Sequence, residues 1–167
     1  MSLSDLSSIA SVVSGVAVAI TLVFLVFQMR QNTFAVKAAA SQAYSTAYAD
    51  LSNITVVNGD MARIWRLGNA DMSQLNDDER VRYVSYLSTI FRFVESARLQ
   101  WRHGQLDGEH WHALVSDFKD LTMQPGVKAY WALRRHWHTE EFRKWYELLP
   151  KSETVPALYG VPAQEPR

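Results

Sequence analysis

The feature that most constrains this chain is a long apolar run near its N-terminus. Residues 6–29 carry no charged side chain, and Asp5 and Arg30 bound the run. At about 1.5 Å of rise per residue, a helix of this length covers the roughly 30 Å hydrocarbon core of a bilayer. Only a helix satisfies every backbone N–H and C=O within one segment in that environment. We therefore expect residues 1–5 to form a short tail and residues 6–29 a single transmembrane helix.

A cleaved signal peptide is the alternative interpretation of the run. No basic region precedes it, it is longer than the roughly 7–15-residue apolar region of such peptides, and no A-x-A site lies directly at its end. Arg30 and Lys37 follow the run, whereas no Lys or Arg precedes it. Because Lys and Arg are enriched on the cytoplasmic side of membrane spans, we expect the N-terminus outside and the rest of the chain in the cytoplasm.

Charge and cysteine content exclude several function classes. Lys plus Arg equals Asp plus Glu at 17 each, so the chain lacks the basic field that non-specific nucleic-acid binding requires, and we expect no nucleic-acid partner. The chain has no cysteine, which excludes disulfides, thiolate catalysis and iron–sulfur clusters. About 120 residues follow the span, enough for one domain with a single core.

Helix signals place that domain at residues 30–149. The apolar helix should continue to Thr55, because neither Gly nor Pro occurs between Gln28 and Thr55, and Asn58-Gly59 should end it. Further helices are expected from Asp60 to Leu67 with Gly68 just past the end, from Asn76 to His103, from Asp107, over residues 127–137 and over residues 139–149. No strand pattern competes, so we predict an all-α fold in which the long helix packs with four or five shorter ones. Residues 150–167 contain several prolines and should form an extended tail.

One face of the N-terminal helix is small or polar. Ser7, Ser14, Thr21 and Gln28 recur every seven residues, and Ser7, Ser11, Gly15 and Ala19 recur every four. In lipid, small residues permit close helix approach and hydroxyl or amide groups bond across the interface. This seam (Ser7, Ser11, Ser14, Gly15, Ala19, Thr21, Gln28) predicts association of the helix with another copy or with another membrane protein.

Two other interpretations of the seam remain open. In a monomeric anchor, Ser and Thr would satisfy themselves by bonding the i−4 carbonyl. A water-filled pore could be lined by Ser7, Ser14, Thr21 and Gln28. Beyond the span, Phe34, Tyr44, Tyr48 and Leu51 lie on roughly the opposite side of the helix, where we expect the domain to cover them.

The candidate metal ligands lie at two His-Trp-His triplets, residues 110–112 and 136–138. Glu109 with His112, and His138 with Glu141, have the i,i+3 spacing that a helical metal pair uses. We favour surface histidines beside inward-packed tryptophans, and expect no metal, cofactor or catalytic residue. Glu95 could act as a general base, but Arg98 at i+3 offers an ion-pair partner and makes a structural role the expected one.

A basic and aromatic cluster occupies the last two helices. Arg134, Arg135, Arg143 and Lys144 alternate with tryptophans there, as suits contact with anionic lipid headgroups. The alternative is that the tryptophans lie in the core and the cations are solvated.

The order of motifs resembles a group of small bacterial membrane-anchored helical proteins of unknown function. The resemblance covers residues 9–149 and rests on Gln28-Met29-Arg30-Gln31-Asn32-Thr33, Ala62-Arg63-Ile64, Asp78-Glu79-Arg80, Phe91-Arg92-Phe93-Val94-Glu95, Gly104-Gln105-Leu106, Pro125-Gly126-Val127 and Trp131. It implies an inner-membrane protein with a cytoplasmic helical domain, and no activity. Ser96 stands where the family usually has Asn, which weakens any polar pair there.

These observations predict a non-enzymatic, single-pass inner-membrane protein. It would act by association, as a homo-oligomeric scaffold or as an accessory subunit of a membrane complex. An oligomeric channel lined by the seam is the alternative, and a His/Glu metal-binding protein or enzyme is the second alternative.

Overall fold

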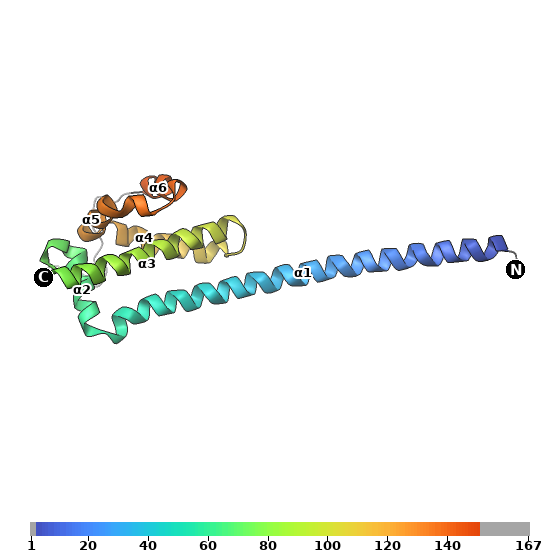
Figure 1. Ribbon diagram of the computed structural model, residues 1–167, viewed down its shortest axis with the longest axis horizontal. Helices are drawn as coiled ribbons and strands as arrows, with labels where there is room; N and C mark the ends of the chain where they lie inside the picture. The colour runs from blue at the N-terminus through green and yellow to red at the C-terminus, as the bar shows by residue number, and fades with distance from the viewer. Residues whose placement is uncertain (1–2, 151–167) are drawn as a thin grey trace, which may run out of the picture. The chain divides into compact units, whose positions relative to one another are not determined.

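The computed structural model describes residues 3–150, and no strand occurs in that range (Figure 1). The predicted all-α fold is confirmed. Its elements are α1 (Leu3–Val57), α2 (Gly59–Ala70), η1 (Met72–Gln74), α3 (Asp77–Arg102), α4 (Gly108–Thr122), α5 (Pro125–Arg134), η2 (Arg135–Trp137) and α6 (Glu140–Glu147), where η denotes a 3₁₀ helix. Beyond Pro150, the predicted extended tail lies outside the described residues.

The chain divides into two units, one up to Ala40 and the other from Ser41 onward. In the first unit, every side chain from Val13 to Ala39 is exposed. Among the described residues, α1 is the one helix long and apolar enough to cross a membrane, and none of its most apolar window is covered by the rest of the protein. A core helix of a soluble domain would be mostly covered, so this helix could instead span a bilayer.

The start of α3 follows its local sequence closely. The Asn76 side chain accepts from the Glu79 N–H at 2.9 Å, and the Glu79 carboxylate accepts from the Asn76 N–H at 3.1 Å, a complete capping box. The helix ends at Arg102, and Gly104 takes the left-handed conformation, with φ of 67°. The predicted limits of this helix are confirmed.

The limits of α2 differ from the prediction at both ends. Asn58, not Asp60, caps the helix, and its side chain accepts from the Met61 N–H at 3.1 Å. The helix continues through Gly68 to Ala70, because Gly68 serves packing rather than termination. A Cβ at Gly68 would lie 2.6 Å from the Tyr83 ring, and one at Gly126 would overlap the Gly68 carbonyl oxygen. The two glycines thus let the backbones of α2 and α5 meet.

The predicted helix over residues 127–137 is two elements. It begins earlier, with Pro125 at its first turn, where proline needs no N–H partner. It ends at Arg134, and one 3₁₀ turn carries the chain to Trp137. Thr139 caps α6 by accepting from the Phe142 N–H at 3.3 Å, so the last helix starts where predicted, but it ends at Glu147 rather than at residue 149. Figure 1 shows α3 and α4 side by side, and residues 103–107 connect them.

The core of the second unit centres on the buried ring of Phe91. Ring centroids of Phe118, Tyr130 and Trp131 lie 4.9, 5.0 and 5.6 Å from it. The fully buried large side chains around this centre are Tyr83, Tyr130, Phe91, Phe142, Ile64, Leu87, Val94 and Val127. Because these residues come from α2, α3, α5 and α6, one core holds the whole unit together.

The last turns of α1 belong to this second unit. Tyr44 and Leu51 pack against the core, and the Tyr86 hydroxyl donates to the Leu51 carbonyl at 2.7 Å. The predicted covering of the aromatic face is therefore confirmed at these two positions. Phe34, in the first unit, is 76% exposed and Tyr48 is 43% exposed, so the prediction is wrong at Phe34 and Tyr48.

Candidate functional site

The seam lies on the exposed part of α1. All seven of its residues are exposed. A heptad stripe drifts by only about 20° per repeat around a straight helix, so Ser7, Ser14, Thr21 and Gln28 form a narrow polar line. The four-residue series of Ser11, Gly15 and Ala19 winds away from that line. Heptad stripes favour left-handed helix crossings and small-xxx-small series right-handed ones, so the seam contains two distinct potential contact faces.

Two seam hydroxyls are bonded within their own helix. Ser11 Oγ donates to the Ser7 carbonyl at 3.0 Å, and Thr21 Oγ1 donates to the Ala17 carbonyl at 2.8 Å. This is the self-satisfied arrangement described for a monomeric anchor. A hydroxyl oxygen that has donated its proton still has lone pairs, so each oxygen remains able to accept from a second helix.

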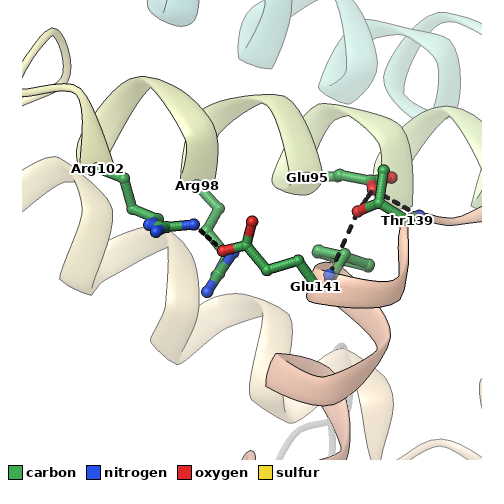
Figure 2. Close-up of polar contacts among 6 residues, drawn as sticks. Glu95, Arg98, Arg102, Thr139 and Glu141 are labelled. Atoms are coloured by element: carbon green, nitrogen blue, oxygen red, sulfur yellow. Dashed lines mark hydrogen bonds and ion pairs between the residues drawn. The ribbon is translucent and has the colours of Figure 1, made fainter.

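A second polar site joins α3 to the start of α6 (Figure 2). Glu95 Oε1 accepts from the Thr139 N–H at 3.0 Å and from the Thr139 hydroxyl at 2.5 Å. Its other oxygen, Oε2, lies 2.9 Å from His138 Nδ1. An ionised carboxylate only accepts, so Nδ1 carries a hydrogen. Glu95 thereby fixes both the capping residue of α6 and the residue before it.

The predicted ion pair between Glu95 and Arg98 is wrong. Arg98 donates to Glu141 at 3.0 Å, and Arg102 pairs with the same carboxylate (Figure 2). Arg98 follows Glu95 by three residues, but the folded chain gives each a partner more than forty positions away. No local signal in the sequence could have identified these partners.

The electrostatics of Glu95 reflect two opposing effects. Burial would raise the pKa of this carboxyl, because the charged form is less well solvated. The hydrogen bonds from Thr139 and His138, together with the charge of His138, outweigh burial and hold the pKa below its ordinary value. Glu95 is therefore a carboxylate held in its charged form, which suits an anchor for α6 and disfavours a general base.

The four candidate metal ligands lie in different surroundings. His138 is buried and takes an extended backbone, so the helical i,i+3 geometry expected with Glu141 does not form, and Glu141 instead faces two arginines. Glu109 and His112 do share α4, and His112 lies edge-on to Trp101. Within residues 3–150, no three His, Asp or Glu side chains gather as a metal site would need.

The basic cluster is partly neutralised by its neighbours. Arg135 lies 3.8 Å from Glu147, and Lys144 lies 2.7 Å from Glu140. The Arg134 guanidinium stacks 4.6 Å from the centre of the Trp137 ring. Arg143 is half-buried. Of the tryptophans, Trp131 is buried, and Trp145 packs on Phe118. Headgroup contact thus stays a prediction, with a weaker local charge than the sequence suggested.

Comparisons with known proteins add no further constraint. The chain matches no protein-family model, no curated protein and no solved structure. The function is therefore inferred from the fold, the seam and the polar contacts described above.

Proposed function

We propose that this protein is a single-pass membrane protein that acts by association through the seam of α1. It forms a homo-oligomeric scaffold or serves as an accessory subunit of a membrane complex, with the domain after the span in the cytoplasm. The bilayer and a second membrane helix are its partners.

The exposure of α1 is the observation that carries the proposal. Large apolar side chains face outward on every side, among them Ile20 at 64%, Val23 at 71% and Met29 at 70% exposure. Soluble proteins rarely leave so continuous an apolar surface uncovered. In a bilayer, lipid chains solvate these apolar side chains, so their exposure carries no free-energy penalty. The small and polar seam is then the part of the helix surface best suited to contact another protein.

Two substitutions test the two faces of the seam separately. A Cβ at Gly15 meets nothing within 4 Å, so Gly15→Leu leaves the helix itself undisturbed and obstructs only a neighbour on the four-residue face. Thr21→Leu obstructs the heptad face and removes its hydroxyl. Ile20→Phe adds bulk roughly 140° around the helix from Gly15 and about 100° from Thr21, and serves as the control.

The measurement is the mass of the complex extracted from native membrane in mild detergent, with every co-purifying protein identified. We expect a defined oligomer or a stoichiometric partner for the unmodified chain and for Ile20→Phe, and its loss with Gly15→Leu or Thr21→Leu. A monomer without partners, or a complex that survives both seam substitutions, contradicts association through the seam.

Orientation has a separate test. The chain has no cysteine, so Ser116→Cys on exposed α4 provides a single labelling site. A membrane-impermeant maleimide should label it in inside-out vesicles and not in right-side-out vesicles. The reverse pattern would place the domain outside.

A further inference from the structure

A partly open cavity of about 360 Å³ lies within the second unit, between the end of α1 and helices α2, α3 and α4. Its walls are mainly apolar and aromatic, and include Trp65, Tyr86, Phe93, Leu114 and Phe118. The volume is in the range of small-molecule sites, which are mostly apolar with a few placed polar groups. Nothing in the proposed association through the seam uses this cavity.

Most hydroxyl donors along the cavity are committed to the protein. Tyr86 donates to the Leu51 carbonyl at 2.7 Å, Ser52 to the Tyr48 carbonyl at 3.0 Å and Thr55 to the Ser52 carbonyl at 3.0 Å. These groups therefore have little donor capacity left for a ligand. A ligand that needs several hydrogen-bond donors from the protein, such as a sugar or a carboxylate, would be poorly served here.

Among the described residues that line the cavity, only Asp117 is charged. It accepts from the Tyr48 hydroxyl at 3.3 Å. Across the described part of the chain, no Lys, Arg or His nitrogen lies within ion-pair distance of its carboxylate. The cavity thus offers a negative charge without a cationic partner.

Aromatic rings surround the same end of the cavity. The centroids of Tyr48 and Phe93 lie 6.4 Å apart, and Tyr44 stacks on Phe93 at 5.3 Å. Aromatic faces are electronegative, so they attract cations, and quaternary ammonium groups are recognised by such clusters. Burial is the main reason that the pKa of Tyr44 is raised, and Tyr48 and Asp117 raise it further. Of these causes, only the Asp117 carboxylate places a negative charge near the rings.

We propose that this cavity binds a small organic cation with an apolar body. The apolar body lies against Trp65, Tyr86 and Phe118, and the ammonium group lies beside Asp117 and the rings of Tyr48 and Phe93. An anion of the same shape would meet the Asp117 charge and be excluded.

The test uses the full chain in lipid nanodiscs and equilibrium dialysis, with binding to empty nanodiscs subtracted. The probes are benzyltrimethylammonium and benzylsulfonate, which have similar apolar bodies and opposite charges. We expect saturable binding of the cation and none of the anion at the same concentration. No saturable binding of the cation, or equal binding of both probes, would overturn the proposal.

Two pairs of variants locate the site. Asp117→Asn keeps an acceptor for Tyr48 but removes the charge, and should weaken cation binding about two- to fivefold, as expected for a partly exposed charge. Asp120→Asn, on exposed α4 surface outside the cavity, should change nothing. An unchanged affinity in Asp117→Asn contradicts the assigned position of the ammonium group.

Ser52→Trp fills the cavity from an exposed position on α1 and should abolish binding. Ser45→Trp is its matched control, because both hydroxyls bond the i−4 carbonyl and only Ser52 lines the cavity. Binding that survives Ser52→Trp, or is lost equally in both variants while circular dichroism shows an intact fold, places the ligand elsewhere and refutes this site.

Discussion

Replacing Glu95 with alanine removes the shared acceptor of His138 and Thr139. The His138 side chain is only 1% exposed, so water cannot replace the lost bond to its Nδ1–H, at a cost of about 1–3 kcal/mol. The two Thr139 donors regain water, and each loses about 0.5–1.5 kcal/mol of net stabilisation. The expected total is about 2–6 kcal/mol, a large part of the roughly 5–15 kcal/mol that holds a typical domain folded.

Thermal unfolding followed by near-ultraviolet circular dichroism measures this loss on the full chain in detergent micelles. At about 4 °C per kcal/mol for a domain of this size, the midpoint should fall by roughly 8–24 °C. Glu95→Gln keeps an oxygen for Thr139 and disrupts only the bond to His138, so it should lose less, about 1–3 kcal/mol.

Glu140→Ala is the matched control in the first turn of α6. Its carboxylate pairs with Lys144 at 71% and 72% side-chain exposure, and such surface pairs contribute about 0–1 kcal/mol. If Glu95→Ala melts within about 2 °C of the unmodified chain, as a surface substitution would, then Glu95 does not fasten α6 and the reasoning from buried donors fails.

Three further predictions concern pH and glycine. The pKa of Glu95 is lower in the folded protein than its ordinary value of 4.5. The ionised carboxylate therefore contributes its full stabilisation of the fold above pH 4.5, and this contribution is lost as the pH falls through the folded-state pKa. The melting midpoint should drop in that acid range, and it should drop less in Glu95→Gln. Gly126→Ala should destabilise by several kcal/mol through overlap with the Gly68 carbonyl, whereas Gly59→Ala, with open space around it, should be neutral or slightly stabilising in the same melts. Gly104→Ala should cost about 1 kcal/mol because φ is positive, and an unchanged midpoint would contradict that strain.

The features that the sequence predicted well depend on neighbouring residues. The capping box of Asn76 and Glu79 spans three positions, and the helix it starts was located correctly. The sequence predicts Asp60 as the N-cap of α2, but the N-cap is Asn58. Both residue types are good N-caps, and only the structure shows that the Asn58 side chain accepts from a free N–H of the first turn.

The features that were missed depend on contacts between distant parts of the chain. The sequence alone predicts that Gly68 ends a helix, because nothing in the sequence signals its packing against Gly126. The sequence predicts that Glu95 pairs with the nearby Arg98. In the structure Glu95 instead accepts from His138, whose buried Nδ1–H has no access to water as an alternative acceptor. The cavity beside Asp117 likewise depends on a contact between distant residues. Tyr48 of α1 bonds to Asp117 of α4, and no periodic pattern in the sequence predicts that these two helices meet.

The contact between Gly68 and Gly126 also restricts how the sequence can diverge. Most core contacts join side chains, so a larger residue on one side can be offset by a smaller one on the other. Here the obstacle to a side chain at position 126 is a backbone carbonyl, which every amino acid shares. No second side-chain substitution can relieve that overlap. Homologous chains that keep this fold should therefore vary together at contacting positions such as Trp65 and Tyr86, whose ring centroids lie 5.0 Å apart, but retain glycine at position 126.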